Sequence, residues 1–106
     1  MEYSNEIYTI NDIQNTITSI AKKYPEIEKI ILFGSYARNE AFETSDIDLI
    51  ITKPKKIRPM LVFTLVGEIS DTLKKPVEIF RESDVDSKSD FNKNITKEGI
   101  TIYEKD

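Results

Sequence analysis

The residues best suited to chemistry lie in one short segment, which begins with a Gly34-Ser35 pair after an apolar run. Ten residues later, Asp46-Ile47-Asp48 opens a second apolar run. Glycine lets the backbone approach a ligand closely, and amides at a helix N-terminus point toward anions. Carboxylates beside a bound phosphate are suited to hold a divalent cation. The segment therefore predicts a phosphate-binding turn next to a metal site, which are the two parts that nucleotidyl transfer requires.

The two aspartates are predicted to share one face of a strand, because side chains along a strand alternate with a period of two. Asp46 and Asp48 project from that face, and Ile47, Leu49 and Ile51 project from the other face into the core. Two carboxylates this close repel each other when both are ionised. A divalent cation removes that cost, so we expect one or two Mg²⁺ ions, about 3.5–4 Å apart where two are present.

Three further residues extend the candidate site. The Ser35 hydroxyl is placed to donate to a phosphate oxygen, and Arg38, about one turn further along the same helix, is a charge-assisted donor for a triphosphate. Glu78 is the best candidate for a third carboxylate, because Val77 and Ile79 on either side of it face the core while Glu78 faces the other way. Weaker rivals for that position follow in the next connection: Glu82, Asp84 and Asp86.

Each feature has a plain structural explanation when it is taken alone. A Gly-Ser pair is a common turn, Asp-x-Asp is compatible with solvated charge at a strand end, and Glu78 is compatible with the exposed face of an edge strand. The joint pattern is more specific, because an apolar strand, the Gly-Ser turn, a fixed spacer and the two aspartates occur together.

Apolar periodicity predicts four helices and four strands that alternate along the chain. The Pro59–Leu73 helix begins with proline and ends at Lys74-Lys75-Pro76. Gly67 within it has two explanations, close approach of another backbone or tolerated sequence drift. We expect a single domain of residues 1–106 in the α/β or α+β class. The expected helices cover residues 10–24, 35–41, 59–73 and 91–98, and the expected strands cover residues 28–33, 46–52, 77–80 and 100–103.

Composition narrows the possible chemistry. The chain has 106 residues with no cysteine and no histidine, which excludes disulfides, thiolate metal sites, His-ligated zinc and Ser-His triads. Its net charge of −4 argues against a domain devoted to nucleic acid. No stretch is apolar enough to span a membrane, and the acidic segment from Met1 to Glu6 does not resemble a signal peptide. We therefore expect a cytoplasmic protein.

Gly34-Ser35, the spacer with Ala37-Arg38, Asp46-Ile47-Asp48 and the closing strand around Ile100 resemble the minimal nucleotidyltransferases of the DNA polymerase β superfamily. Within that superfamily the chain is most similar to the MNT antitoxins of HEPN–MNT toxin–antitoxin modules. The resemblance covers about residues 10–104. It implies a small mixed sheet backed by helices, with the motif at one end.

The resemblance also implies an activity: Mg²⁺-dependent transfer of AMP from ATP to a hydroxyl, with release of pyrophosphate. In the antitoxin branch the acceptor is a tyrosine of the HEPN toxin, an RNase that the modification silences. Asp46, Asp48 and Glu78 would then bind metal, with Glu78 helping to deprotonate the acceptor, and Gly34 and Ser35 would hold the triphosphate. The chain departs from the family at two positions, because Asn39 replaces a frequent glycine and Glu78 a frequent aspartate.

The chain's size favours a macromolecular acceptor that brings its own docking surface. The apolar start of the Pro59–Leu73 helix, from Met60 to Phe63, and the side chains of Tyr36 and Phe42 are candidate contacts if they are exposed. Two alternatives remain open at this point. One is an antitoxin that neutralises its partner by binding alone, and the other is a nucleotidyltransferase for small molecules such as antibiotics.

Overall fold

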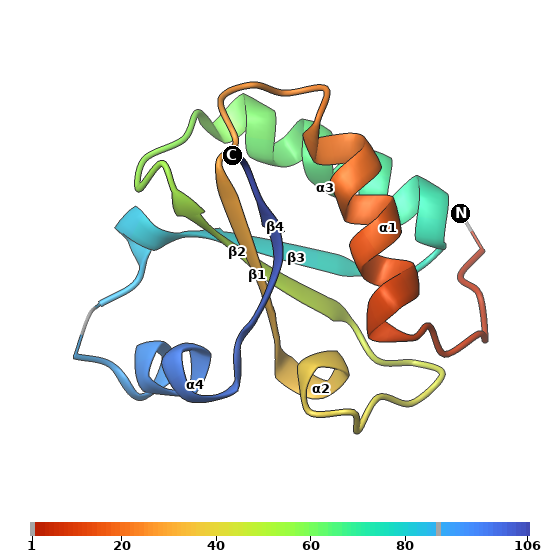
Figure 1. Cartoon of the computed structure of the whole chain (residues 1–106). Helices are drawn as coiled ribbons and strands as arrows, with labels where there is room; N and C mark the ends of the chain where they lie inside the picture. Colours follow the sequence, from red (N-terminus) through yellow and green to blue (C-terminus); the bar gives the residue numbers. More distant parts are fainter. Residues whose placement is uncertain (1, 87) are drawn as a thin grey trace.

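The elements follow one another in the order that the apolar pattern predicts (Figure 1). The structure is a computed structural model that describes residues 2–86 and 88–106; Met1, with which the acidic N-terminal segment begins, and Ser87, in the charged connection before the last helix, lie outside the described residues. The elements are α1 (Ile10–Ala21), β1 (Lys29–Phe33), α2 (Gly34–Ala37), β2 (Ile47–Lys53), α3 (Pro59–Leu73), β3 (Val77–Arg81), the short 3₁₀ turn η1 (Glu82–Asp84), α4 (Asp90–Glu98) and β4 (Ile100–Glu104).

The four strands form one mixed sheet in the order β3-β2-β1-β4. The β1 strand pairs antiparallel with β2 and β4, whereas β2 and β3 run parallel because α3 connects them. The predicted mixed α/β class is confirmed. The central position of β2 places Asp48 between Phe33 on β1 and Glu78 on β3 in the register of the sheet.

The two faces of the sheet are covered by different helices (Figure 1). Apolar side chains of α1 and α3, including Ile13, Ile17 and Leu65, pack on one face against Leu49 and its neighbours in the main core. On the other face α4 contributes Ile95 to a smaller cluster with Phe33 and Ile50. The alternation expected along β2 is confirmed, because Ile47, Leu49 and Ile51 lie in the main core.

The helix ends show where local sequence was informative. The α1 helix begins with a capping box between Thr9 and Asp12, and α3 covers the predicted residues, with Pro59 in its first turn and Lys74 in the left-handed conformation at its end.

The α2 helix is shorter than predicted and ends at Ala37. Its continuation stops because Asn39 has a φ of 58°, the left-handed conformation that asparagine tolerates better than most residues.

The expectation that Tyr36 is exposed was wrong, and one of the two explanations for Gly67 does not hold. Tyr36 is not exposed, since only 2% of it is accessible and its ring packs in the main core. Gly67 does not mark a close backbone approach, because a Cβ atom built there meets no heavy atom within 4 Å. In contrast, Phe42 is exposed as expected, and Met60 and Phe63 at the start of α3 are exposed as well.

No helix within the described residues is both long enough and apolar enough to cross a lipid bilayer.

Candidate active site

The glycine turn and the second aspartate are in direct contact. Gly34 follows the last residue of β1 and has a φ of 77°, a conformation that strains residues with a Cβ atom. A Cβ atom built on it would lie 2.3 Å from Asp48 Oδ2. The backbone of the turn therefore lies against the carboxylate, and only glycine leaves room for both. This places the phosphate-binding candidate and the metal-binding candidate at one point.

The carboxyl group of Asp48 has a raised pKa. Burial, together with the negative charges of Glu78 and Asp46, raises the pKa of its carboxyl from 3.8 to about 6, while the positive charge of Arg38 opposes the shift. The charges of Glu78 and Asp46 therefore reach the Asp48 carboxyl and influence its ionisation. Perturbed carboxyl groups of this kind are typical of functional sites.

The three carboxylates reach this region from different backbone positions. Asp48 is held in the ladder of β2, and Glu78 is its register partner on β3. Asp46 lies just before β2 begins and is exposed. Glu78 is exposed as well, on the opposite side of its strand from Val77 and Ile79, which pack against the main core.

The donor set suits a hard divalent cation. All candidate ligands are carboxylate oxygens, which Mg²⁺ prefers, and a bound cation would relieve the excess negative charge that shifts Asp48. Among residues 2–86 and 88–106, no three Asp or Glu side chains are grouped closely enough to enclose an ion by themselves. A cation held by Asp46 and Asp48 would thus take its other ligands from nucleotide phosphates and water. The role of Glu78 as a third ligand stays a prediction.

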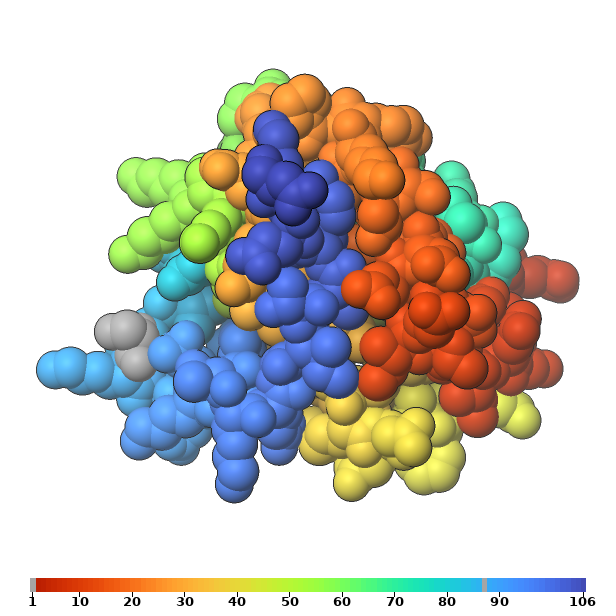
Figure 2. All heavy atoms as spheres, in the orientation of Figure 1, coloured from red at the N-terminus to blue at the C-terminus, as the bar shows by residue number. Residues whose placement is uncertain are grey.

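Arg38 is engaged with acidic side chains of the protein. Its Nε donates to Glu40 at 3.1 Å and its Nη1 donates to Glu98 at 3.1 Å. Glu98 is the last residue of α4, so the second ion pair connects α4 to the turn that follows α2. In the space-filling view, atoms of α4 (blue) and of the α2 region (yellow) meet along the lower edge of the molecule (Figure 2). Sequence reasoning missed Glu98, because nothing local relates it to Arg38.

An aromatic cluster forms the apolar side of the site. The ring centroids of Phe33 and Phe91 lie 5.2 Å apart, those of Phe80 and Phe91 5.1 Å, and those of Phe33 and Phe80 5.9 Å. Phe33 is the register partner of Asp48, and paired residues share a face of the sheet. The cluster therefore removes water from one side of Asp48, which is consistent with burial as the main cause of its raised pKa.

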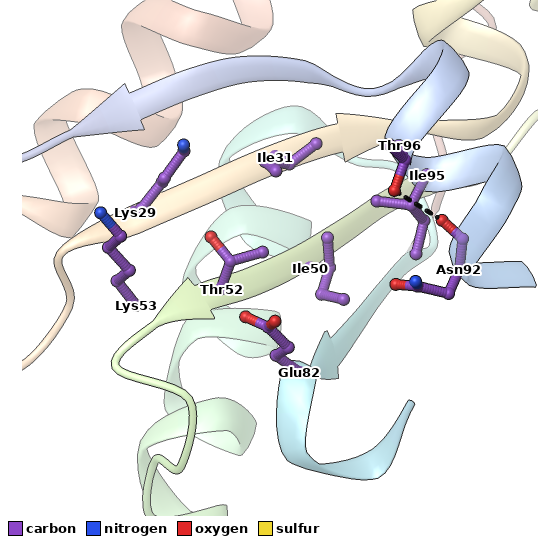
Figure 3. A pocket seen from close by; sticks show the side chains of 9 residues that line it. All are labelled: Lys29, Ile31, Ile50, Thr52, Lys53, Glu82, Asn92, Ile95 and Thr96. Atoms are coloured by element: carbon purple, nitrogen blue, oxygen red, sulfur yellow. Dashed lines mark hydrogen bonds between the residues drawn. The ribbon is translucent and has the colours of Figure 1, made fainter. Parts of the chain in front are cut away.

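A separate cavity of about 390 Å³ lies further along the same face of the sheet, between β1, β2 and α4. Figure 3 shows Ile50 and Thr52 on β2, with Ile95 and Thr96 of α4 at one side and two lysine side chains near the strand ends. None of the main site candidates lines it, but Glu82, a weaker rival of Glu78 for the third carboxylate, does. The lining residues are Lys29, Ile31, Ile50, Thr52, Lys53, Glu82, Asn92, Ile95 and Thr96.

The sequence of residues 15–106 matches the family model described as "Polymerase beta, Nucleotidyltransferase". The chain belongs to this family. It is a nucleotidyltransferase, and the resemblance stated from the motif is confirmed.

Two relatives in Methanocaldococcus jannaschii are informative. One, named "Putative protein adenylyltransferase MJ0604", is 33% identical over 93% of this chain and 99% of its own length. Another, "Putative protein adenylyltransferase MJ0126", is 32% identical over 73% of this chain and 82% of its own length.

Several solved structures of similar fold come from toxin–antitoxin complexes. A chain of a toxin–antitoxin structure with AMP-PNP superposes with a TM-score of 0.74 at 18% identity, covering 87% of this nucleotidyltransferase and 73% of that chain. A chain from a complex of tri-AMPylated HEPN toxin with MNT antitoxin from Shewanella oneidensis gives a TM-score of 0.69 at 16% identity, covering 92% and 74%. At these identities the likeness establishes the fold.

Proposed function

We propose that this nucleotidyltransferase transfers AMP from ATP to a hydroxyl of a protein acceptor, and that the acceptor is a tyrosine of a HEPN-type toxin. In this role the protein is an antitoxin that silences its partner by covalent modification. The observation that carries the proposal is the contact between the Gly34 turn and Asp48, because it brings the candidate triphosphate-binding turn next to a candidate metal ligand.

Two comparisons support the choice of acceptor. The relatives with a third of their residues identical are named as protein adenylyltransferases. The structures of similar fold include one in which the HEPN toxin is AMPylated and bound to its MNT antitoxin.

The residues of the site have distinct proposed roles. The backbone at Gly34 and the Ser35 hydroxyl hold the triphosphate, and Arg38 adds positive charge beside it. Asp46 and Asp48 would hold one or two Mg²⁺ ions, with Glu78 as the third acidic group. When bound, Mg²⁺ neutralises phosphate charge and makes the acceptor hydroxyl easier to deprotonate.

In the reaction, the acceptor oxygen attacks the α-phosphorus of ATP in line with the bond to the β-phosphate. A new P–O bond joins AMP to the acceptor, the bond to the β-phosphate breaks, and pyrophosphate leaves. Glu78 accepts the proton of the acceptor hydroxyl in this scheme. Most of the rate enhancement comes from positioning and charge neutralisation, because such transfers ask for little covalent chemistry from the protein.

The direct test uses ATP labelled at the α-phosphate, Mg²⁺ and a HEPN-domain protein encoded in the same genome. We expect label on a tyrosine of that protein, located by mass spectrometry, and loss of label with Asp46→Asn or Asp48→Asn. Full neutralisation of the toxin by both variants would instead show that binding alone suffices. Label on an aminoglycoside with none on protein would support a small-molecule acceptor.

A further inference from the structure

Lys75 is a fully buried lysine close to the connection that carries Asp46. None of its surface is accessible, although it lies between the end of α3 and the start of β3, where a basic residue is expected to be solvated. Lysine is almost never fully buried unless its ammonium has partners. The partners of Lys75 are two backbone carbonyls, Ser4 O at 2.7 Å and Glu43 O at 2.6 Å.

These two carbonyls belong to segments that are far apart in the sequence. Ser4 lies in the N-terminal segment before α1, and Glu43 lies in the connection between α2 and β2. In the described part of the chain, no Asp or Glu forms an ion pair with Lys75. The buried charge is therefore compensated by carbonyl dipoles, and losing either carbonyl would leave part of its hydrogen-bonding capacity unmet.

Hydrogen bonds hold the connection between α2 and β2 on both sides of Asp46. On one side Lys75 holds Glu43, three residues before Asp46. On the other side Ile47 N donates to Pro76 O at 2.9 Å, directly after Lys75 in the chain. Asp46 lies just before the β2 ladder begins, so the position of its carboxylate depends on these two hydrogen bonds and on the turn in which Ser45 N donates to Phe42 O at 3.0 Å.

We propose that Lys75 is a positioning residue whose ammonium holds the connection before β2, so that Asp46 reaches the cation that it shares with Asp48. The inference rests on the proposed function for the role of Asp46. Groups that orient metal ligands commonly change metal affinity by about 10- to 100-fold when they are lost. A contribution to stability alone would lower the unfolding midpoint and leave metal dependence unchanged.

The first variant is Lys75→Met, which keeps a long unbranched side chain and removes the donors. Tyr8→Phe is its matched control, because Tyr8 Oη donates to Leu73 O at 2.7 Å and so links the N-terminal segment to the end of α3 rather than to the connection. We expect Lys75→Met to raise the Mg²⁺ concentration for half-maximal transfer about 10-fold or more, with the KM for ATP within about two-fold. Tyr8→Phe should leave the Mg²⁺ dependence within about two-fold of wild type.

A second readout does not depend on activity. Phe42 is 74% exposed and lies directly before Glu43, so chymotrypsin cleavage after it reports how firmly the connection is held. We expect cleavage there, identified by mass spectrometry, to be about 10-fold faster in Lys75→Met and unchanged in Tyr8→Phe, because cleavage tracks local opening. If the wild type transfers no AMP, the proposed function fails, and cleavage after Phe42 together with Mn²⁺ binding in the presence of AMP-PNP still tests Lys75.

The absence of cysteine allows a chemical rescue. Lys75→Cys introduces the sole thiol, which can be alkylated in denaturant and the chain refolded. Aminoethylation restores an ammonium at nearly the original distance, whereas propylation gives an uncharged group of the same length. We expect only the aminoethylated protein to recover wild-type Mg²⁺ dependence and slow cleavage after Phe42.

The proposal is overturned if Lys75→Met folds and retains the wild-type Mg²⁺ dependence and cleavage rate. It is also overturned if the propylated protein recovers as fully as the aminoethylated one. If neither Lys75→Met nor the propylated protein folds, the ammonium is required for folding rather than for positioning Asp46. That result would also overturn the proposal.

Discussion

The backbone of Gly34 packs directly against the side chain of Asp48: a Cβ atom at position 34 would lie 2.3 Å from the Asp48 Oδ2 atom. The glycine also has a φ of 77°, so a larger residue is strained by its backbone as well as by the contact. The turn and the carboxylate must therefore be considered together.

Gly34→Ala tests that relationship. We expect it to lower the free energy of unfolding by about 1–3 kcal/mol, because it combines backbone strain with displacement of the Asp48 carboxylate. In the background of Asp48→Ala the contact is absent, so Gly34→Ala should lower the free energy of unfolding by less. The remaining loss should reflect backbone strain alone. Chemical denaturation of the wild type, the two single variants and the double variant measures the difference. Equal costs in both backgrounds would show that the two residues are not coupled.

The raised pKa of Asp48 predicts how metal-free stability depends on pH. The carboxyl has its ordinary pKa of 3.8 when unfolded and about 6 when folded, so the protonated form is favoured in the fold. The stability that the group contributes is complete below about pH 4 and is lost as the pH rises through 6. Asp48→Asn mimics the protonated form. We expect it to stabilise the protein by about 2 kcal/mol at pH 7.5, given about 1.4 kcal/mol per pKa unit and partial screening by solvent.

Denaturation in EDTA at pH 7.5 and at pH 4 measures this effect. The stabilisation by Asp48→Asn should nearly vanish at pH 4, where the wild-type carboxyl is itself largely protonated. A stabilisation of the same size at both values would assign the effect to something other than titration of Asp48.

The ion pair between Arg38 and Glu98 predicts an effect on nucleotide binding. If Arg38 turns toward a triphosphate, it must leave Glu98, so Glu98→Gln should tighten binding of ATP a few-fold, while Arg38→Ala weakens it. Glu26→Gln is the matched control, because it breaks a similar surface pair with Arg58 on another part of the molecule. Isothermal titration with AMP-PNP and Mg²⁺ measures all three. Unchanged affinity in Glu98→Gln would mean that Arg38 stays with the protein when nucleotide binds.

The exposed aromatic Phe42 predicts where the acceptor docks. It borders a cavity of about 430 Å³ together with Ile7, Glu43 and Thr44, and it lies four residues before Asp46. We expect Phe42→Ser to raise the KM for a protein acceptor without changing the KM for ATP. The double variant Met60→Ser/Phe63→Ser, on the exposed side of α3, is the control and should change neither. Steady-state transfer assays distinguish the two surfaces, and the reverse pattern would move the acceptor site to α3.

The local pattern predicted the parts of the site that depend on one element. Alternation along β2 placed Asp48 opposite the core side chains, and the bounds of α3 followed from Pro59 and the lysines after it. The burial of Lys75 could not be predicted locally, because it depends on two carbonyls that only the tertiary fold brings to it. The pairing of Arg38 with Glu98 escaped prediction for the same reason, since 60 residues separate them.

The central claim is that Asp46 and Asp48 jointly hold a divalent cation beside a triphosphate bound at the Gly34 turn. A crystal of the protein grown with AMP-PNP and Mn²⁺ tests it through the anomalous signal of the metal. We predict at least one Mn²⁺ peak within bonding distance of both carboxylates and of a phosphate oxygen, with the triphosphate against Gly34 and Ser35. Bound nucleotide with no metal peak at these carboxylates, at saturating Mn²⁺, would contradict the account.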